Sequence, residues 1–304
     1  MKELVYRLIY WPPLNAVLLA INKVLRPVLP GSFRLPPSGT IVVDTGRSRF
    51  RMATNQTCYL TQLVYWNGFD GFEYSSIFRD LVNDMQCFID IGANTGYYSI
   101  AAATLNSKIQ VHAFEPAYGP LHYLKTNVAL NDLEDRLHVS DLALSDQQGS
   151  IKFFETGSRK FPWVRHVLAG DGSLLRSDDR AVVMERDVRM DTLDHYVKKY
   201  DIRNVDLIKV DTEGTEPSIL DGAEETISRD MPIIICETLY NTTESELDRR
   251  LKAWGYVIYK HLPNGLERAS ALERAKDDGV RNCFFVHSSR EGVLARFMST
   301  STKA

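Results

Sequence analysis

Residues 87–99 read C-F-I-D-I-G-A-N-T-G-Y-Y-S, and the predicted fold is organised around them. Its first five residues are mostly apolar and predict a strand that is buried on both faces and ends at Gly92. Gly92 and Gly96 allow unusual backbone angles and a close approach to a ligand, and residues 97–105, with three consecutive alanines, predict a helix. Strand, glycine turn and helix are the general plan of a nucleotide site, although such turns also simply pack a helix on a sheet.

A second apolar strand is predicted over residues 110–116, Q-V-H-A-F-E-P, and Glu115 near its end comes 25 residues after Asp90. A carboxylate at that place can accept hydrogen bonds from both hydroxyls of a ribose; the alternative is an exposed loop carboxylate. A pyrophosphate loop needs glycines at the first, third and sixth positions, and here only Gly92 fits. NAD is therefore disfavoured. S-adenosylmethionine (SAM), which has no phosphate, fits better, with Asp90 near its amino group directly or through water.

Together, D-I-G-A-N-T-G-Y-Y-S and F-E-P resemble the FkbM family of SAM-dependent methyltransferases. The resemblance covers about residues 71–287 and implies an α/β fold of class I methyltransferase (Rossmann-like) type, with a doubly wound, mostly parallel sheet. G-F-E at residues 71–73 is similar to the family's G-x-Y-E, but a helix-start carboxylate explains it equally well. A-L-S-D at residues 143–146 also resembles the family. The cofactor contacts that the resemblance implies are Glu73, Asp90, Gly92, Ala93, Asn94, Thr95, Gly96, Glu115, Pro116, Asp141 and Ala143.

A third group of residues follows the buried strand predicted over residues 206–210, where D-T-E-G-T-E begins at Asp211. Parallel sheets bind ligands at this edge, and the stretch matches the second characteristic motif of the family. Helix-start chemistry accounts for Glu216 but not for Asp211 and Glu213. We therefore expect Asp211 to be the catalytic carboxylate, with Glu213 and Glu237 as further candidates.

The same carboxylates raise a metal hypothesis. Glu237 directly follows the strand predicted over residues 232–236, so Asp211, Glu213 and Glu237 could hold a divalent cation through oxygen ligands. Nothing in their spacing requires a metal, and none is favoured.

Composition limits the class of protein. A chain of 304 residues with 44% hydrophobic content can bury a large core, and a formal charge of −3 without a basic stripe gives no reason to expect nucleic acid. The four cysteines show no C-x-x-C spacing, which favours buried thiols in a reducing cytoplasm over a zinc site. No apolar run approaches the length of a transmembrane helix.

We expect three parts: an amphipathic helix, linker and cap over residues 1–85, the SAM-binding domain over 86–290, and a tail over 291–304. The first helix carries Leu14, Val17, Leu18, Ile21 and Leu25 on one face, among basic residues and with a single glutamate. Residues 1–30 could thus lie on an anionic membrane, although packing on the main domain or a dimer partner is favoured. Within the cap, we expect strands over 40–44 and 58–65 and a helix over 75–85.

Further elements are predicted from apolar periodicity. The helices are expected over 121–130 and 245–254, and the strands over 137–144, 256–260 and 282–287, with the late strands as an edge hairpin whose last member is antiparallel. Residues 188–197 read as a strand that leads into a helix. Residues 151–187 show no clear period, but they contain a cluster of basic and aromatic side chains that could close over an anionic or sugar-like substrate, or be a solvated loop: Arg159, Lys160, Phe161, Trp163, Arg165 and His166.

The resemblance implies methylation of a hydroxyl on a sugar, glycolipid or natural product. Asp211 is the first candidate for the general base, with Glu213, Glu237 and His166 behind it. Two alternatives stay open: an NAD-dependent oxidoreductase, and a non-catalytic SAM-binding module. The expected location is cytoplasmic, and a membrane association through residues 1–30 is left as an open alternative; the acceptor and the oligomeric state, a homo-oligomer included, are left undetermined.

Overall fold

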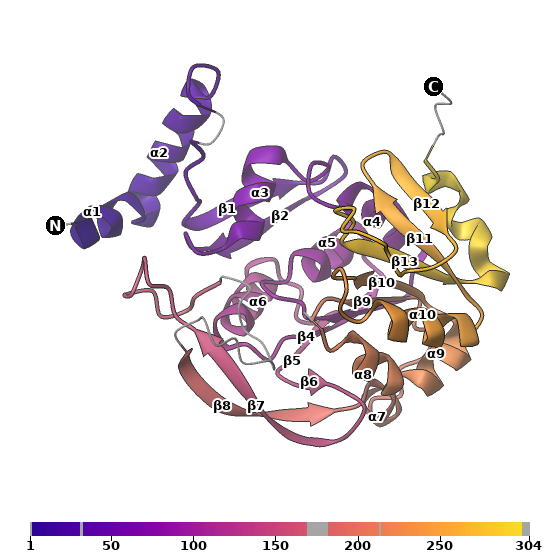
Figure 1. Cartoon of the computed structure of the whole chain (residues 1–304). Coiled ribbons are helices and arrows are strands. Elements are labelled where there is room, and N and C mark those ends of the chain that lie inside the picture. The colour runs from indigo at the N-terminus through magenta and orange to yellow at the C-terminus, as the bar shows by residue number, and fades with distance from the viewer. Residues whose placement is uncertain (1, 31–32, 169–181, 213, 300–304) are drawn as a thin grey trace.

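An eight-stranded sheet forms the centre of the computed structural model, which describes residues 2–30, 33–168, 182–212 and 214–299 (Figure 1). Its strands follow the order β12-β11-β13-β10-β9-β3-β4-β5. Their bounds are β3 Cys87–Ile91, β4 Gln110–Phe114, β5 Leu137–Ser140, β9 Leu207–Val210, β10 Ile233–Glu237, β11 Tyr256–Leu262, β12 Gly265–Ala269 and β13 Asn282–His287. The sheet strands predicted from apolar runs are thus present, with small shifts at their ends.

Strand direction confirms the expected fold class. β5, β4, β3, β9 and β10 are parallel, whereas β13 is antiparallel and lies between β10 and β11. The edge hairpin consists of β11 and β12, so the prediction that the last strand belongs to it is wrong. The chain builds outward from β3 to β5 and then returns to β9, so the order reverses between β3 and β9. Ligands bind at such a reversal, outside the carboxyl ends of the strands.

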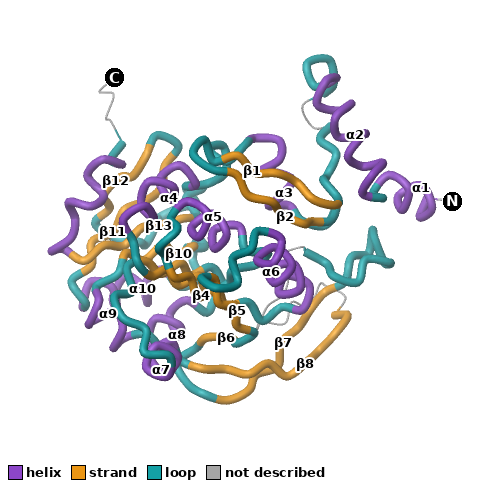
Figure 2. Tube along the Cα trace, turned by 180° about the vertical axis from the view of Figure 1, so that it is seen from behind, coloured by secondary structure: helices purple, strands orange, loops and turns teal. Residues whose placement is uncertain are grey.

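Helices cover both faces of the sheet (Figure 2). Successive residues of a strand point to opposite faces, so Phe88 joins one core cluster and Ile89 joins the other. One face packs against α4 Ser75–Leu81, α5 Tyr97–Leu105 and α6 Tyr118–Leu130, and the other against α7 Leu193–Lys199, α8 Glu216–Asp221, α9 Glu224–Asp230 and α10 Glu244–Ala253. Two 3-10 helices, η1 Val82–Asp84 and η2 Ser288–Phe297, complete the domain.

The N-terminal cap differs from its prediction. It consists of α1 Lys2–Ile9, α2 Pro12–Leu25, the hairpin of β1 Gly39–Asp44 with β2 Arg49–Thr54, and α3 Tyr59–Asn67. The strand predicted over residues 58–65 is wrong, because this segment forms α3. Its aromatic and β-branched residues favour a strand locally, but Thr61 and Val64 lie three apart on the buried side of a helix, and packing overrides propensity. β2 was not predicted.

A small second sheet, ordered β6-β8-β7, flanks the carboxyl edge of the large one. It contains β6 Ala143–Leu144, β7 Gly149–Thr156 and β8 Val182–Asp191. The single strand predicted over 137–144 is therefore wrong, because it divides into β5 and β6, which belong to different sheets. The sequence showed no regular periodicity over residues 151–187, and the absence of predicted strands there is wrong for the parts that form β7 and β8. Charged side chains pair across these two strands, where Lys152 Nζ lies 3.2 Å from Glu185 and 3.1 Å from Asp187.

Candidate active site

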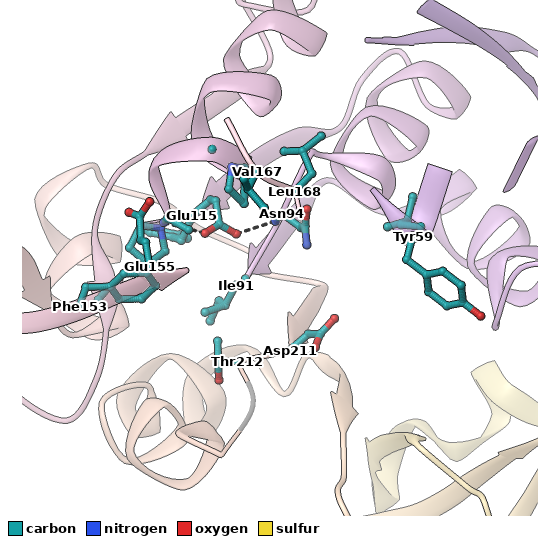
Figure 3. A pocket seen from close by; sticks show the side chains of 18 of the residues that line it. Tyr59, Ile91, Asn94, Glu115, Phe153, Glu155, Val167, Leu168, Asp211 and Thr212 are labelled. Atoms are coloured by element: carbon teal, nitrogen blue, oxygen red, sulfur yellow. Dashed lines mark hydrogen bonds between the residues drawn. The ribbon is translucent and has the colours of Figure 1, made fainter. Parts of the chain in front are cut away.

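A cavity of about 730 Å³ lies at the carboxyl ends of β3, β4 and β9, where the strand order reverses (Figure 3). Ile91, Asn94 and Glu115 reach it from the first two of these strands and the residues after them, and Asp211 with Thr212 follows β9. The cap contributes Tyr59, Leu60, Leu63, Phe72 and Glu73, and the small sheet contributes Ala143, Leu144, Phe153, Glu155 and Met184. The large sheet therefore forms the floor of the cavity, and the cap and the small sheet contribute to its walls.

Gly92 holds the tips of β3 and β9 together. Its φ is +74°, and a Cβ added there would lie 1.9 Å from the carbonyl oxygen of Asp211. Gly96, with φ +88°, faces Leu124 of α6, whose side chain would lie 2.5 Å from an added Cβ. Both glycines are therefore required by close packing within the protein. Packing a helix on a sheet is by itself a sufficient reason for glycines in this turn.

Glu115 is held rigidly beside the glycine turn. One carboxylate oxygen accepts a hydrogen bond from the backbone N–H of Asn94 (2.7 Å) and the other from that of Ala117 (2.8 Å). Burial raises the pKa of Glu115 to about 7, against the effect of these two N–H groups. A carboxylate has about four lone-pair sites, so Glu115 keeps capacity to accept further hydrogen bonds from a ligand.

A buried lysine joins two of the predicted site carboxylates. Lys209 Nζ lies 3.1 Å from the Asp211 carboxylate and 3.6 Å from that of Asp90, and it donates to the carbonyl oxygen of Gly92 at 3.4 Å. Burial lowers the pKa of Lys209, but Asp211 and Asp90 outweigh this effect and raise that pKa overall. The other Asp90 oxygen accepts from Ser99 Oγ at 2.5 Å. Asp90 is therefore part of the support beneath the cavity.

Glu73 reaches the cavity from the cap. It has a positive φ of 42°, uncommon for a residue with a side chain, and it accepts a hydrogen bond from the Tyr98 hydroxyl at 2.9 Å. Burial raises the pKa of Glu73, and Asp211 adds to the rise. The backbone strain and the hydrogen bond fix this carboxyl group at the cavity wall.

The structure brings together most, but not all, of the predicted site residues. On the cavity wall lie Glu73, Gly92, Asn94, Glu115, Pro116, Ala143, Asp211 and Glu237. Away from it lie Asp90, Ala93, Thr95, Gly96 and Asp141. Asp90 contacts Lys209 and Ser99 instead, and Asp141 forms a 2.8 Å ion pair with Arg189 on the surface. Glu213 lies outside the described residues.

Several wall residues were missed. Phe153 and Glu155 come from β7, and Glu155 accepts from the Tyr118 backbone N–H and from Arg186, both at 2.8 Å. Lys209 was also missed, although a lysine within an apolar strand is itself a signal, because a buried ammonium needs carboxylate partners. Alternation along residues 149–156 could have revealed β7, but nothing local indicates which cavity it faces.

The basic and aromatic cluster divides between two surroundings. Arg159 and Arg165 line the main cavity, whereas Phe161 packs against Tyr6 and Tyr10 of the N-terminal region with ring centroids 5.7 and 5.3 Å apart. His166 stacks on His122 at 3.9 Å and lines a smaller cavity of about 390 Å³. His166 therefore does not line the main cavity, where Asp211 and Glu237 lie.

Metal ligation finds little support in this geometry. Among the residues that the structure describes, no three histidine, cysteine, aspartate or glutamate side chains are grouped so that they could hold a metal ion. Asp211 and Glu237 both lie on the cavity wall, but the trio proposed from the sequence includes Glu213. The three together are thus not described.

Comparisons with known proteins agree with this geometry. Residues 90–258 match the methyltransferase FkbM domain. Methyltransferase sdnD of Sordaria araneosa is 26% identical over 178 residues, which cover 51% of this chain and 69% of that protein. The 2-O-methyltransferase NoeI of Sinorhizobium fredii is 25% identical over 157 residues, covering 46% of this chain and 58% of that protein, so less than two thirds of the second relative is spanned.

A solved methyltransferase FkbM from Methylobacillus flagellatus KT is 16% identical, with a TM-score of 0.43; the match covers 67% of this chain and 44% of that one. The domain match alone spans more than half of the 304 residues, including the end of β3, all of β4 and β9, and the residues that follow these strands at the cavity. The chain therefore belongs to the FkbM family of methyltransferases.

Proposed function

We propose that this methyltransferase transfers a methyl group from SAM to a hydroxyl oxygen of a sugar, glycolipid or natural-product acceptor. The observation that carries the proposal is one cavity of about 730 Å³ that presents Glu115 and Asp211 together at the strand reversal. Small-molecule sites commonly have volumes of about 300–1,000 Å³, so there is room for a cofactor and part of an acceptor. The similarity to NoeI, a 2-O-methyltransferase, supports oxygen as the acceptor atom.

The residues present fit SAM. Glu115 retains lone pairs for the two ribose hydroxyls, and the buried Oδ1 of Asn94 has no hydrogen-bond partner within the described structure, so it can accept from a ligand N–H. Apolar side chains suited to an adenine ring also line the cavity: Ile91, Phe114, Leu142, Leu144 and Phe153. When bound, SAM supplies an electrophilic methyl group on a sulfonium, which an alcohol oxygen can attack in line.

Asp211 is the residue that we assign to the acceptor hydroxyl. It would accept the hydroxyl's hydrogen bond, align the oxygen, and take the proton as the new carbon–oxygen bond forms. Lys209 forms an ion pair with this carboxylate at 3.1 Å, which restricts the orientation of the carboxylate. Glu237 lies on the same wall and is the second candidate.

Transfer of labelled methyl from SAM into cytosolic and membrane extracts tests the proposal. Label should appear in a product whose new bond survives as a methyl ether, and calorimetry should detect binding of SAM but not of NAD. Activity that disappears on exhaustive chelation and returns with a divalent cation would require a metal in the mechanism. Binding of SAM without transfer to any acceptor would favour a non-catalytic module.

We further propose a cytoplasmic location for the enzyme. Cys58, Cys87, Cys236 and Cys283 are all free and buried, which supports a reducing compartment.

A further inference from the structure

The helix α2 has a polar buried face. Asn15, Leu19 and Asn22, spaced four and three apart, are its buried residues. Asn15 donates to the carbonyl oxygens of Ile9 (3.2 Å) and Pro36 (3.3 Å) and accepts from the backbone N–H of Ser38 (2.8 Å). Asn22 likewise donates to Phe33 at 3.3 Å and accepts from Leu35 at 3.0 Å. Two side-chain amides, on either side of the buried Leu19, therefore hold this helix to residues 33–38.

The outward face of the same helix and its neighbour is apolar. Leu4 is 74% exposed, Val24 77% and Val28 80%. The other exposed large apolar residues here are Val5, Leu8, Trp11, Val17, Ile21 and Leu25. Single exposed apolar residues are ordinary, but a contiguous group on a projecting arm indicates an interaction surface. Figures 1 and 2 both show α1 and α2 as such an arm at the margin of the molecule.

The charge on this arm favours an anionic surface. Residues 2–30 carry Lys2, Arg7, Lys23 and Arg26 against Glu3 alone, and Glu3 is already paired with Arg7 at 2.8 Å. Trp11, which is 57% exposed, lies at the bend between the two helices. Basic residues with an exposed tryptophan and aliphatic side chains are typical of helices that lie in the lipid headgroup region. Two copies of the arm would bring the same positive charges together, which disfavours a dimer.

The length of the helices is consistent with lying on a membrane. Within the described ranges, no single helix is long and apolar enough to cross one. In the part of the chain that the structure describes, α1 and α2 meet the requirements of length and composition when they are taken together, and the two are bent by 79°.

The arm is joined directly to the wall of the main cavity. Arg7 lies over the Trp163 ring at 5.3 Å, Lys160 lies over Tyr6 at 5.5 Å, and Phe161 packs edge-on against Tyr10. The same segment, residues 157–168, places Arg159 and Arg165 at the cavity. The arm and this part of the cavity wall thus form one packed unit.

We propose that α1 and α2 lie in the surface of an anionic lipid bilayer, with their apolar face in the lipid, and that the acceptor is a membrane-borne hydroxyl compound. The second half of this inference rests on the proposed O-methyl transfer. Lipid contact would bring residues 157–168, and with them the cavity, to the headgroup layer.

Vesicle co-sedimentation of the full chain tests the proposal. The protein should bind vesicles of equal parts phosphatidylglycerol and phosphatidylcholine more tightly than phosphatidylcholine alone. The double variant Val24→Asp, Val28→Asp should lose most of this binding. Val42→Asp is the matched control, because Val42 is 62% exposed on β1, outside the arm, and it should bind as wild type does. Each of Lys2→Gln and Lys23→Gln should reduce affinity about fivefold.

Three outcomes would overturn the proposal. The first is wild-type protein that does not bind anionic vesicles, and the second is an equal loss of vesicle binding in the Val42 control. The third is a concentration-dependent dimer in the wild type that is absent in the Val24, Val28 double variant. Calorimetry with SAM in vesicle-free buffer separates this test from that of the function. Normal SAM binding without vesicle binding would contradict the membrane inference alone, whereas absence of SAM binding would contradict the proposed function.

Discussion

The ammonium of Lys209 lies 3.1 Å from the carboxylate of Asp211, with the lysine buried in the sheet and the aspartate partly exposed at the cavity. The register of β3 against β9 sets Asp90 beside Lys209, so the second carboxylate is brought by strand pairing. One buried cation therefore connects the structural core with the residue that we assign to the acceptor.

Lys209→Met should destabilise the fold by about 3 kcal/mol, because it leaves Asp90 buried without its cation. Urea unfolding measures the change, and adding Asp90→Asn should restore part of the loss. Lys152→Met, which removes an exposed lysine from β7, is the control and should change stability little. Equal losses of stability in the two lysine variants would contradict the claim that Lys209 stabilises the fold through Asp90.

Asp211→Asn should bind SAM normally and lose about 100-fold or more in turnover, because the amide cannot accept the hydroxyl proton. Single-turnover methyl transfer and calorimetry measure the two effects separately. Asp141→Asn is the matched control: Asp141 lies off the cavity and pairs with Arg189, so both quantities should stay near wild type. Unchanged turnover in the Asp211 variant would move the role to Glu237.

The stability of the SAM-free protein should depend on the protonation of Glu115. Burial raises its pKa to about 7 from the ordinary 4.5, so the folded state keeps a proton that the unfolded state has already lost. The free energy of unfolding should therefore fall as pH rises from about 4.5 to about 7. Glu115→Gln should flatten this part of the profile; a variant with the wild-type slope would show that another group is responsible.

SAM affinity should show the opposite pH dependence. Ionised Glu115 is the better acceptor for ribose hydroxyls, so SAM should bind more tightly as pH rises through about 7. Glu115→Gln should bind SAM about tenfold or more weakly at pH 8. Calorimetry across pH 5.5 to about 8 on both proteins isolates this carboxyl from the titration of SAM itself.

Gly92→Ala should destabilise the fold by about 2 kcal/mol or more, because its Cβ would meet the Asp211 carbonyl oxygen and its φ is left-handed. Gly279→Ala is the control: φ is +78° there, but nothing lies within 4 Å of an added Cβ. Thermal unfolding of both variants separates backbone strain from collision. Similar losses in the two would mean that the strand tips can move apart without cost.

The parts of the fold predicted well were those with strong local signals. β3 ends where predicted because an apolar run meets a glycine that must take positive φ, and β13 was predicted without error over residues 282–287. α3 was predicted as a strand because its aromatic and β-branched residues suit either structure, and only its burial against the cap selects the helix.

The site residues that could be predicted from the sequence are those that directly follow the end of a strand. Glu115 follows β4 and Asp211 follows β9, the two neighbours of β3, and both residues line the cavity. Asp90 was expected to contact a cofactor, but the lysine opposite it in β9 is visible only once the strands are paired. Phe153 reaches the wall through a second sheet: alternation along residues 149–156 could have revealed β7, but nothing local indicates which cavity the strand faces.

The position of β13 has a consequence for synthesis. This strand occupies an interior place between β10 and β11, although it is the last strand described along the chain. Until residues 282–287 have left the ribosome, β10 has an open edge and the β11–β12 hairpin has no neighbour to join. The nascent protein therefore exposes pairing-competent backbone at β10 until residues 282–287 have been synthesised.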